Sequence, residues 1–461
     1  MDQTALRQEI AELERRLALA RGQVPRRRDP SRAGLSFMQS QLWFLEQLAP
    51  GRPTYHITVA RRVRGPLDVP ALREALSVVV TRHEALRTTF GVTDDGIPFQ
   101  VIRAAGAAGG EGLVVEQAGV DFRAQLREAA ARPFDFANEP LFRVRLLRLA
   151  PEDHVLWLTM HHMCADGWSV GLLLRELAEV YAGVLRGALP ELPELAVQPG
   201  DLADWQIMRQ REGALEEDLA YWEQRLRGAV PVDLPADRPR PSLPSYRGDG
   251  LAYLMPLEVL EGARDVARRG GTTLFAVVVA ALKAVLARWT GLDDIVIGTA
   301  DSGRFRPELE PMVGCLINMM ALRTDLSGDP SFAELASRVS AGLAEAMNHR
   351  GVPLDMIVER LNLPRDPSRN PLFQIAIDIQ QAAAFEWELP GCVIEPVEGE
   401  STTSRFDMAI NTYETPAGLA FRVEFAADLF DRSRVERLLG HLERVLRAVA
   451  ADAGVRVSGL P

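Results

Sequence analysis

Residues 155–169 read Val-Leu-Trp-Leu-Thr-Met-His-His-Met-Cys-Ala-Asp-Gly-Trp-Ser. The first six are apolar, aromatic or β-branched residues, which is typical of a buried strand. Two adjacent histidines follow, and a helical pattern begins soon after them with Ser169 as the expected N-cap. The segment therefore predicts a strand, a turn and a helix with an imidazole at the turn. Such an arrangement suits acyl transfer to an amine or a hydroxyl.

The two histidines are expected to have different roles. Successive side chains of a strand point to opposite faces, so His161 and His162 face opposite ways if the strand persists through them. Only one of the two side chains can then face a given cleft, and the other must be held by packing or hydrogen bonds. A neutral histidine can accept a proton near pH 7, and such general base catalysis contributes roughly 10²–10⁴ in rate. For a lone histidine, the alternative is a buried core residue whose hydrogen bonds are made within the protein. The whole pattern of residues 161–167 favours a functional role instead.

Asp166 and Gly167 are expected to shape the turn. A carboxylate in a tight turn usually accepts backbone N–H bonds or pairs with an arginine, so Asp166 is a less suitable group to act on substrate. Gly167 permits a tight turn or a positive φ. The candidate partners of Asp166 are Arg82, Arg87 and Arg323, and the sequence does not rank them.

Composition restricts the class of protein. The 461 residues are 47% apolar and 25% charged, which indicates a globular, soluble chain of two lobes. A net charge of −11 disfavours nucleic acid as a partner. Arg26, Arg27 and Arg28 are interpreted as a charged linker. No signal peptide or membrane-spanning run is recognised, so a cytoplasmic location is expected. The protein is also expected to be a monomer.

The three cysteines, Cys164, Cys315 and Cys392, have neither disulfide nor zinc spacing. We interpret all three as small buried residues, and Cys164 is not expected to be a nucleophile. No metal site and no tightly bound cofactor are predicted.

The chain divides into four parts by pattern. Residues 1–34 hold an amphipathic helix at 4–21 and a linker, 35–190 form a first lobe, 191–250 a proline-rich linker and 251–461 a second lobe. The stripe of the first helix is expected to pack on its own domain, with docking of a partner helix as the alternative. The expected strands are 54–65, 98–103, 140–149, 155–162, 294–299, 372–380 and 406–413. The expected helices are 35–48, 69–86, 169–186, 273–290, 331–347, 353–361 and 432–451.

Several motifs resemble one family. Residues 161–167 match the HHxxxDG signature of the chloramphenicol-acetyltransferase-like superfamily, which also includes wax ester, diacylglycerol and plant-type acyltransferases. The remaining motifs resemble those of nonribosomal peptide synthetase condensation domains. These are the opening motif at 36–45, the RHExLRTxF motif at 82–90, the next motif at 201–205, the interlobe linker at 234–241 and the RDxSRNPL motif at 365–372.

The resemblance implies a fold, an activity and a site. The fold would be α/β, an α+β sandwich with two acetyltransferase-like lobes in a V-shaped pseudo-dimer around a central tunnel. The activity would be peptide bond formation, in which a carrier-bound acceptor amine attacks a carrier-bound donor thioester. His162 would be catalytic, as base or by positioning the amine, and His161 would support it. Residues expected to be structural at the active site are Asp166, Gly167, Ser169, Arg82 and Arg87.

The resemblance also implies partners. Substrates would arrive on the phosphopantetheine of donor and acceptor peptidyl carrier proteins, after activation by an adenylation domain in the same or a neighbouring chain. The alternatives are an ester-forming or free-standing enzyme with a hydroxyl or small-molecule acceptor, and a non-catalytic module that recruits carriers. Met1 fits a natural start, whereas the ending at 457–461 resembles the run into a following domain and favours an excised piece.

The subtype resembles the form that accepts an L-configured donor, because residues 82–90 and 166–169 follow its pattern. Two regions depart from the family. Residues 314–319 read Gly-Cys-Leu-Ile-Asn-Met in place of GxFVNT, and residues 349–355 read His-Arg-Gly-Val-Pro-Leu-Asp in place of HQDxPFE. Leu316 and Met319 are expected to repack, with a reshaped substrate channel as the alternative.

Overall fold

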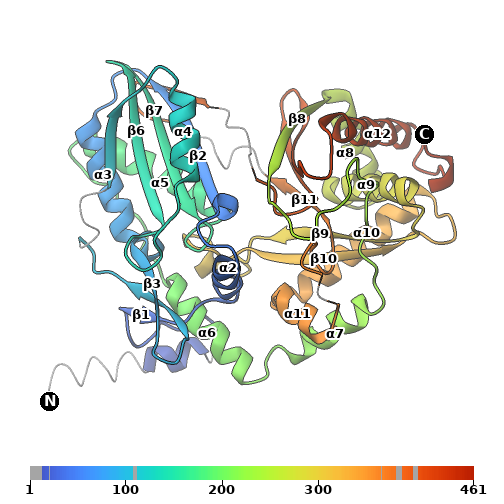
Figure 1. Cartoon of the computed structure of the whole chain (residues 1–461), viewed down its shortest axis with the longest axis horizontal. Helices are drawn as coiled ribbons and strands as arrows, with labels where there is room; N and C mark the ends of the chain where they lie inside the picture. Colours follow the sequence, from blue (N-terminus) through green and yellow to red (C-terminus); the bar gives the residue numbers. More distant parts are fainter. Residues whose placement is uncertain (1–12, 20, 107–111, 365, 381–386, 398–402) are drawn as a thin grey trace. The chain divides into compact units, whose positions relative to one another are not determined.

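The chain folds into two compact units in a computed structural model that describes residues 13–19, 21–106, 112–364, 366–380, 387–397 and 403–461. Unit 1 comprises residues 1–214, 302–317 and 383–399, and unit 2 comprises the remainder. Each unit combines a β-sheet with packed helices (Figure 1). The expected mixture of α and β elements is therefore present in both halves.

Unit 1 is built on a five-stranded sheet. In spatial order its strands are β12 (Val393–Pro396), β2 (His56–Arg64), β7 (Asp153–His161), β6 (Phe142–Ala150) and β5 (Leu113–Gln117). A small second sheet contains β1 (Arg32–Ala33), β4 (Pro98–Ile102) and β3 (Thr88–Val92). The strand that ends at His161, β7, is central in the larger sheet, where both of its edges are paired.

Helices cover both faces of the larger sheet of unit 1 (Figure 1). Helices α3 (Val69–Arg82) and α5 (Gly167–Leu185) pack with Val63, Leu156 and Leu158 on one face. Helix α4 (Phe122–Ala131) places Leu126 against Trp157 on the other. Because β7 is buried on both faces, it has a nearly continuous apolar sequence. Unit 1 also contains α2 (Phe37–Leu48), α6 (Pro199–Arg211) and the short 3-10 turns η1 (Pro53–Tyr55), η2 (Glu84–Arg87) and η3 (Pro307–Leu309).

Unit 2 is built on a six-stranded sheet. In spatial order its strands are β10 (Asn318–Asp325), β9 (Asp294–Asp301), β11 (Ile375–Gln380), β13 (Met408–Thr415), β14 (Gly418–Ala426) and β8 (Gly248–Pro256). Its helices are α7 (Glu216–Leu226), α8 (Leu257–Arg269), α9 (Leu274–Thr290), α10 (Phe332–Asn348), α11 (Leu354–Arg360) and α12 (Arg432–Ala451), followed by η5 (Val457–Gly459).

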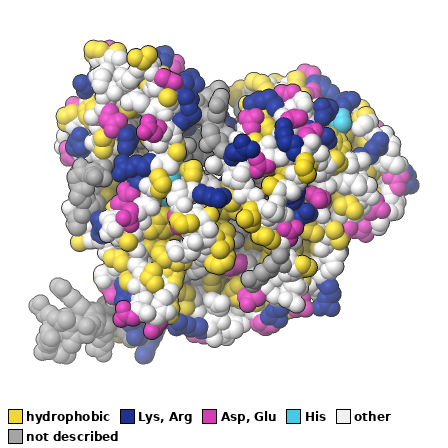
Figure 2. All heavy atoms as spheres, in the orientation of Figure 1, with side chains coloured by type: hydrophobic (Ala, Val, Ile, Leu, Met, Phe, Trp, Pro, Cys, Tyr) yellow, Lys and Arg dark blue, Asp and Glu magenta, His cyan; other side chains and the backbone are white. Residues whose placement is uncertain are grey.

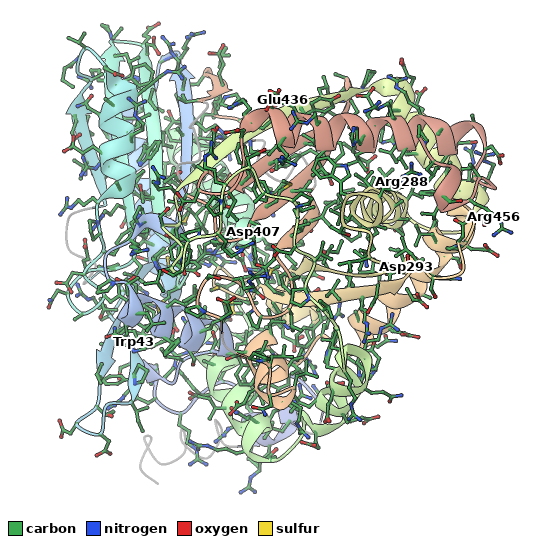
Figure 3. All side chains as sticks on the ribbon, turned by 45° about the vertical axis from the view of Figure 1, so that its right-hand side comes forward. Trp43, Arg288, Asp293, Asp407, Glu436 and Arg456 are labelled. Atoms are coloured by element: carbon green, nitrogen blue, oxygen red, sulfur yellow. The ribbon has the colours of Figure 1, made fainter. Side chains whose placement is uncertain are left out.

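Helix α9 forms the centre of unit 2, in contact with α8, α10 and α12 (Figure 1). Its buried run from Ala276 to Leu286 includes Lys283, whose ammonium donates to Leu322 O at 2.6 Å and Thr324 Oγ1 at 2.7 Å. Burial lowers the pKa of Lys283 well below its usual range. At the end of α9, Arg288 donates to the carbonyls of Ser458 and Leu460 and so fixes the last residues of the chain (Figure 3).

The predicted domain boundaries differ from this division. Residues 191–214 lie in unit 1 with α5, whereas 215–250 lie in unit 2. Two segments assigned by sequence to the second lobe, 302–317 and 383–399, also belong to unit 1. The physical reason is pairing: β12 adds to the edge of the unit 1 sheet beside β2, and 302–317 bonds to the start of α5.

All of the expected helices and strands outside the N-terminus appear within a few residues of their predicted bounds, with one notable break. The helix predicted over 69–86 ends at Arg82, because His83 is extended with φ −101° and ψ 109°. The chain then forms the 3-10 turn η2. The predicted N-cap of α2, Ser36, is confirmed, with its side chain accepting from Gln39 N.

The N-terminal predictions have a mixed outcome. Residues 13–19 are helical, and the rest of the helix predicted at 4–21 lies outside the described residues except for 21. The interpretation of Arg27 as part of a charged linker is wrong. Its side chain is 3% exposed, with nitrogen–oxygen distances of 2.7 Å to Glu84 and 2.9 Å to Asp201. The segment before α2 is therefore anchored to unit 1 by buried ion pairs.

Charged side chains of both signs are interspersed on the face of the molecule shown in Figure 2. The described residues also form exposed ion pairs such as Arg447 with Glu258, which lie 2.9 Å apart. No single helix within the described ranges is both long and apolar enough to span a membrane. The consecutive helices α8 and α9 reach that length and hydropathy only as a pair bent by 105°.

Replacement of Lys283 by alanine tests the packing of α9. The change leaves a cavity and removes the donor from two buried acceptors, so we expect the free energy of unfolding to fall by about 2–5 kcal/mol. Urea unfolding measures the loss. The control is Arg264→Ala, which removes an exposed ion pair with Glu414 and should cost at most about 1 kcal/mol. Equal stability of Lys283→Ala and the unchanged protein would contradict the role assigned to this lysine.

Candidate active site

The histidines lie where β7 ends. His161 is the last residue of the strand and pairs with His56 of β2, and His162 N donates to Tyr55 O at 2.8 Å. His161 is 1% exposed, whereas His162 is half-buried. The alternation expected for a strand through both residues does not apply, because β7 ends at His161 and His162 belongs to the turn. A turn at 162–164 then connects the strand to α5.

His161 is held inside unit 1 as a neutral imidazole. Its Nδ1 accepts a hydrogen bond from Met163 N at 3.1 Å, so the ring proton belongs on Nε2. The rings of Phe136 and His56 lie edge-on to it, with centroids 4.9 Å and 5.8 Å away. Burial, followed by the nearby His56, lowers the pKa of His161 to about 3. A ring with such a low pKa is a poor general base, so His161 is a structural residue.

Asp166 is a buried N-cap. It is 2% exposed, and its carboxylate accepts five hydrogen bonds from three residues. Oδ1 accepts from the backbone N–H of Ser169 at 2.9 Å, and Oδ2 accepts from Leu316 N at 3.0 Å. Arg304 approaches both oxygens, with Nη1–Oδ2 and Nη2–Oδ1 distances of 2.8 Å and 3.1 Å. The carboxylate is therefore saturated by protein donors.

Ser169 does not cap α5, contrary to prediction. The helix begins at Gly167, Asp166 is the N-cap, and Ser169 is the third helical residue. The carboxylate at 166 can reach the N–H at 169 and accept from that orphan donor, which makes aspartate the cap. The Ser169 hydroxyl instead lies 2.8 Å from Asp166 Oδ1 and accepts from Gly314 N at 3.1 Å. It connects the cap to the segment 302–317.

None of the arginines proposed as partners of Asp166 occupies that place. Arg82 donates to Glu176 at 3.2 Å, Arg87 pairs with Glu84 at 3.7 Å, and Arg323 pairs with Asp294 at 2.8 Å. Arg82 and Arg87 thus stabilise the η2 turn and its contact with α5, through groups other than Asp166.

The partner is Arg304, which sequence patterns do not reveal. It lies 138 positions from Asp166 and in the other half of the chain, so no local spacing connects them. The glycine that precedes Arg304 is the sequence feature most closely related to this contact. Gly303 has φ +69°, and a Cβ there would lie 1.9 Å from Leu316 O. A side chain at that position would push the segment away from α5.

Gly167 is not required for backbone geometry. Of the two possibilities that glycine permits, a tight turn or a positive φ, the second does not occur, because Gly167 is the first residue of α5. A Cβ built on Gly167 meets no atom within 4 Å. The position therefore has open space beside the histidine turn.

The cysteines are largely as predicted. Burial raises the pKa of the Cys164 thiol to about 12, and its Sγ lies 3.0 Å from Leu141 O. Such a thiol is a poor nucleophile. Cys315 is also buried, but Cys392 is half-buried, so the prediction of full burial is wrong there.

The first family-like motif contacts the histidine turn directly. Gln39, which completes the capping box of α2 with Ser36, donates from Nε2 to Met163 O at 3.0 Å. Trp43, on the same helix, packs its ring against Phe136 with centroids 6.1 Å apart (Figure 3). Since Phe136 packs on His161, α2 supports the turn from two directions.

The two regions that depart from the family pattern, residues 314–319 and 349–355, contact each other through Asn318. Asn318 donates from Nδ2 to Arg350 O at 3.0 Å and Val352 O at 2.7 Å within unit 2. The side chain of Leu316 packs in unit 1 with Trp205 and others, while its backbone N–H binds Asp166. Because the backbone supplies that bond, leucine in place of phenylalanine leaves the Asp166 contact intact. Among the described residues, no group of three or more histidine, cysteine or acidic side chains is placed to hold a metal ion.

Comparison with known proteins identifies relatives over almost the whole chain. A family model described as the condensation domain matches residues 31–460. One of the linear gramicidin synthase proteins of Brevibacillus parabrevis is 38% identical over 93% of the chain, and phosphinothricin tripeptide synthetase PhsC of Streptomyces viridochromogenes is 36% identical over 95%. The matches cover 8% and 41% of those proteins, so the chain corresponds to one part of each.

The X-domain from teicoplanin biosynthesis is a similar solved structure. It is 32% identical, the match covers 94% of this chain and 98% of that one, and the TM-score is 0.85. The predicted fold class, mixed α/β with two acetyltransferase-like lobes, is confirmed by this group of relatives. The V-shaped arrangement of the lobes around a tunnel stays a prediction.

Acid should destabilise the fold through His161. Its pKa is about 3 when folded, against 6.5 for an ordinary histidine, so both states are neutral above pH 6.5 and the contribution is complete there. As the pH falls toward 3, only the unfolded chain takes up the proton. Between pH 8 and pH 5 we expect the original protein to lose roughly 2 kcal/mol more than His161→Asn, in which an amide oxygen can still accept from Met163 N. Equal losses in urea unfolding would contradict a permanently neutral His161.

Removal of Arg304 should be severe, because Asp166 would remain buried without its counter-charge. We expect Arg304→Ala to reduce the free energy of unfolding by about 3–5 kcal/mol. In a double-mutant cycle with Asp166→Ala, the second change should cost less than it does alone. The control is Arg64→Ala, which breaks an exposed pair with Glu395 and should cost at most about 1 kcal/mol. Additive losses would mean that the two groups do not act as a pair.

Proposed function

Because the chain belongs to the condensation-domain family of nonribosomal peptide synthetases, we propose that it forms a peptide bond between two carrier-bound substrates. The acceptor amine attacks the carbonyl carbon of the donor thioester, and a carbon–nitrogen bond forms. The carbon–sulfur bond then breaks and the donor thiolate leaves. The proton lost by the amine reaches the thiolate, so the lengthened acyl chain stays on the acceptor carrier.

The observation that carries this proposal is the difference between the two histidines. His161 is neutral and enclosed, with its Nδ1 occupied by Met163 N. His162 follows it at the strand end and is half-buried. We assign His162 the catalytic role, either as the base that takes the amine proton or as the group that positions the amine. Asp166 then acts as a positioning residue, since its carboxylate is fully occupied by Arg304, Ser169 and Leu316.

Several finer features belong to the same proposal. The pattern at residues 82–90 and 166–169 supports an L-configured donor. The substrates would be held by the phosphopantetheine of donor and acceptor carriers, with an adenylation domain in the same or a neighbouring chain. A monomer in the cytoplasm fits this role. We further propose that Leu316 and Met319 repack without changing the reaction.

A non-catalytic recruitment module is the second candidate, favoured by the likeness to the teicoplanin X-domain. The complete histidine pattern at 161–167 argues for the enzyme instead. An enzyme that makes an ester, from a hydroxyl acceptor or a small molecule, would use the same residues. The acceptor that gives product distinguishes it from peptide synthesis.

Replacement of His162 tests the catalytic assignment. A panel of aminoacyl carriers is offered as donors and acceptors, and product on the acceptor carrier is measured by mass spectrometry. We expect His162→Ala to reduce the rate by about 100-fold or more, in line with the loss of a general base. His162→Gln, which can position an amine but cannot take its proton, separates the two possible roles.

Two control variants accompany this assay. Cys164→Ala removes a thiol that is not expected to react, and His441→Ala removes a histidine of α12 in unit 2. Both should retain most of the activity. Equal product from His162→Ala and the unchanged protein would overturn the catalytic assignment. Absence of product from every variant across the panel, with carrier binding preserved, would favour the recruitment module.

A further inference from the structure

Trp168 is an exposed aromatic residue with a fixed side chain. It is 46% exposed, yet its Nε1 donates to Glu310 O at 2.9 Å. The guanidinium of Arg304 lies 5.6 Å from the ring centroid. A single exposed apolar side chain is common on protein surfaces and by itself needs no explanation. This one differs because it is anchored at one end, so little conformational entropy would be lost when a ligand packs on it.

The position beside Trp168 is open. Gly167 precedes it, and a Cβ built there meets nothing within 4 Å, although the backbone does not require glycine. Both residues belong to the first turn of α5, five and six positions after His162. An anchored ring and an unfilled side-chain position therefore occur together, a few residues after the proposed catalytic residue in the chain.

The charges around this place are largely satisfied. Arg304 binds both oxygens of Asp166 and also donates to the carbonyls of Ser302 and Met312, which leaves only its Nε, itself buried, without a partner. The charge of Arg304 is therefore already paired with that of Asp166. The surface formed by Trp168 and Gly167 suits an uncharged chain, whose planar amides or methyl groups can lie on an indole face.

We propose that Trp168 is a substrate-binding residue, whose indole packs against the pantetheine arm of a carrier-delivered thioester beside Gly167. This inference rests on the proposed function. The arm is uncharged between its phosphate and its sulfur, and it contains two planar amides and a pair of methyl groups. It is also common to all carrier-bound substrates. A ring that recognises it would hold the thioester near His162 regardless of the amino acid attached.

Binding of non-reactive analogues tests the inference directly. Two thioethers of pantetheine are used, one with a small group that resembles glycine and one with a branched group that resembles leucine. NMR titration of the full chain measures their affinities. We expect Trp168→Ala to weaken binding of both analogues equally, by about three- to tenfold, as estimated for loss of an aromatic contact. Trp168→Phe should retain most of the affinity.

The matched control is Leu185→Ala, which removes a 43% exposed apolar side chain from the far end of the same helix and should leave both affinities unchanged. Turnover is measured in parallel with pantetheinyl thioesters, where Trp168→Ala should raise KM and leave kcat nearly unchanged. A purely structural effect on Arg304 would lower kcat instead.

Three results would overturn the inference. The original protein could fail to bind either analogue, Trp168→Ala could bind them as tightly as the original, or the loss could be confined to the leucine-like analogue. The last result would mean that the ring contacts the acyl side chain. Binding with the expected losses, but without turnover in the original protein, would contradict the proposed function while the assigned contact stands.

Discussion

The geometry of the candidate active site depends on the hydrogen bonds of one buried carboxylate, that of Asp166. Burial of a lone carboxylate costs several kcal/mol, so the fold must supply donors for it. It does so from the start of α5 through Ser169 and from the segment 302–317 through Arg304 and Leu316. Once these bonds form, the start of α5 and the segment 302–317 are fixed relative to one another. His162 is held separately, by its backbone N–H bond to Tyr55 O.

The enclosed histidine, His161, also stabilises the turn. His161 uses its Nδ1 to hold the backbone of Met163, and Gln39 holds the carbonyl of the same residue. The turn is thus bound from both sides before any substrate arrives, which is the preorganisation that catalytic groups require. A likeness in fold alone does not decide activity. The functional inference therefore rests on the side chains of the turn that follows β7.

Sequence periodicity predicts many of the helices and strands. The apolar run before His161 predicts β7, but the strand ends at His161 and does not continue through His162, as the alternation of the two histidines would require. The cap of α5 was misassigned because both Asp166 and Ser169 are good capping residues, and only the geometry chooses between them. Arg304 and β12 could not be predicted, because their partners lie far away in the sequence and are set by tertiary pairing.

The central claim is that His161 is a permanently neutral, structural imidazole, which leaves the adjacent His162 as the histidine that we propose acts on substrate. Nitrogen-15 NMR of the imidazole groups between pH 5 and pH 8 tests it most directly, with His161→Asn used to assign the signals. For His161 we predict a neutral ring, protonated on Nε2, whose shifts do not change over this range. Titration of His161 with a midpoint near 6.5 would contradict the claim.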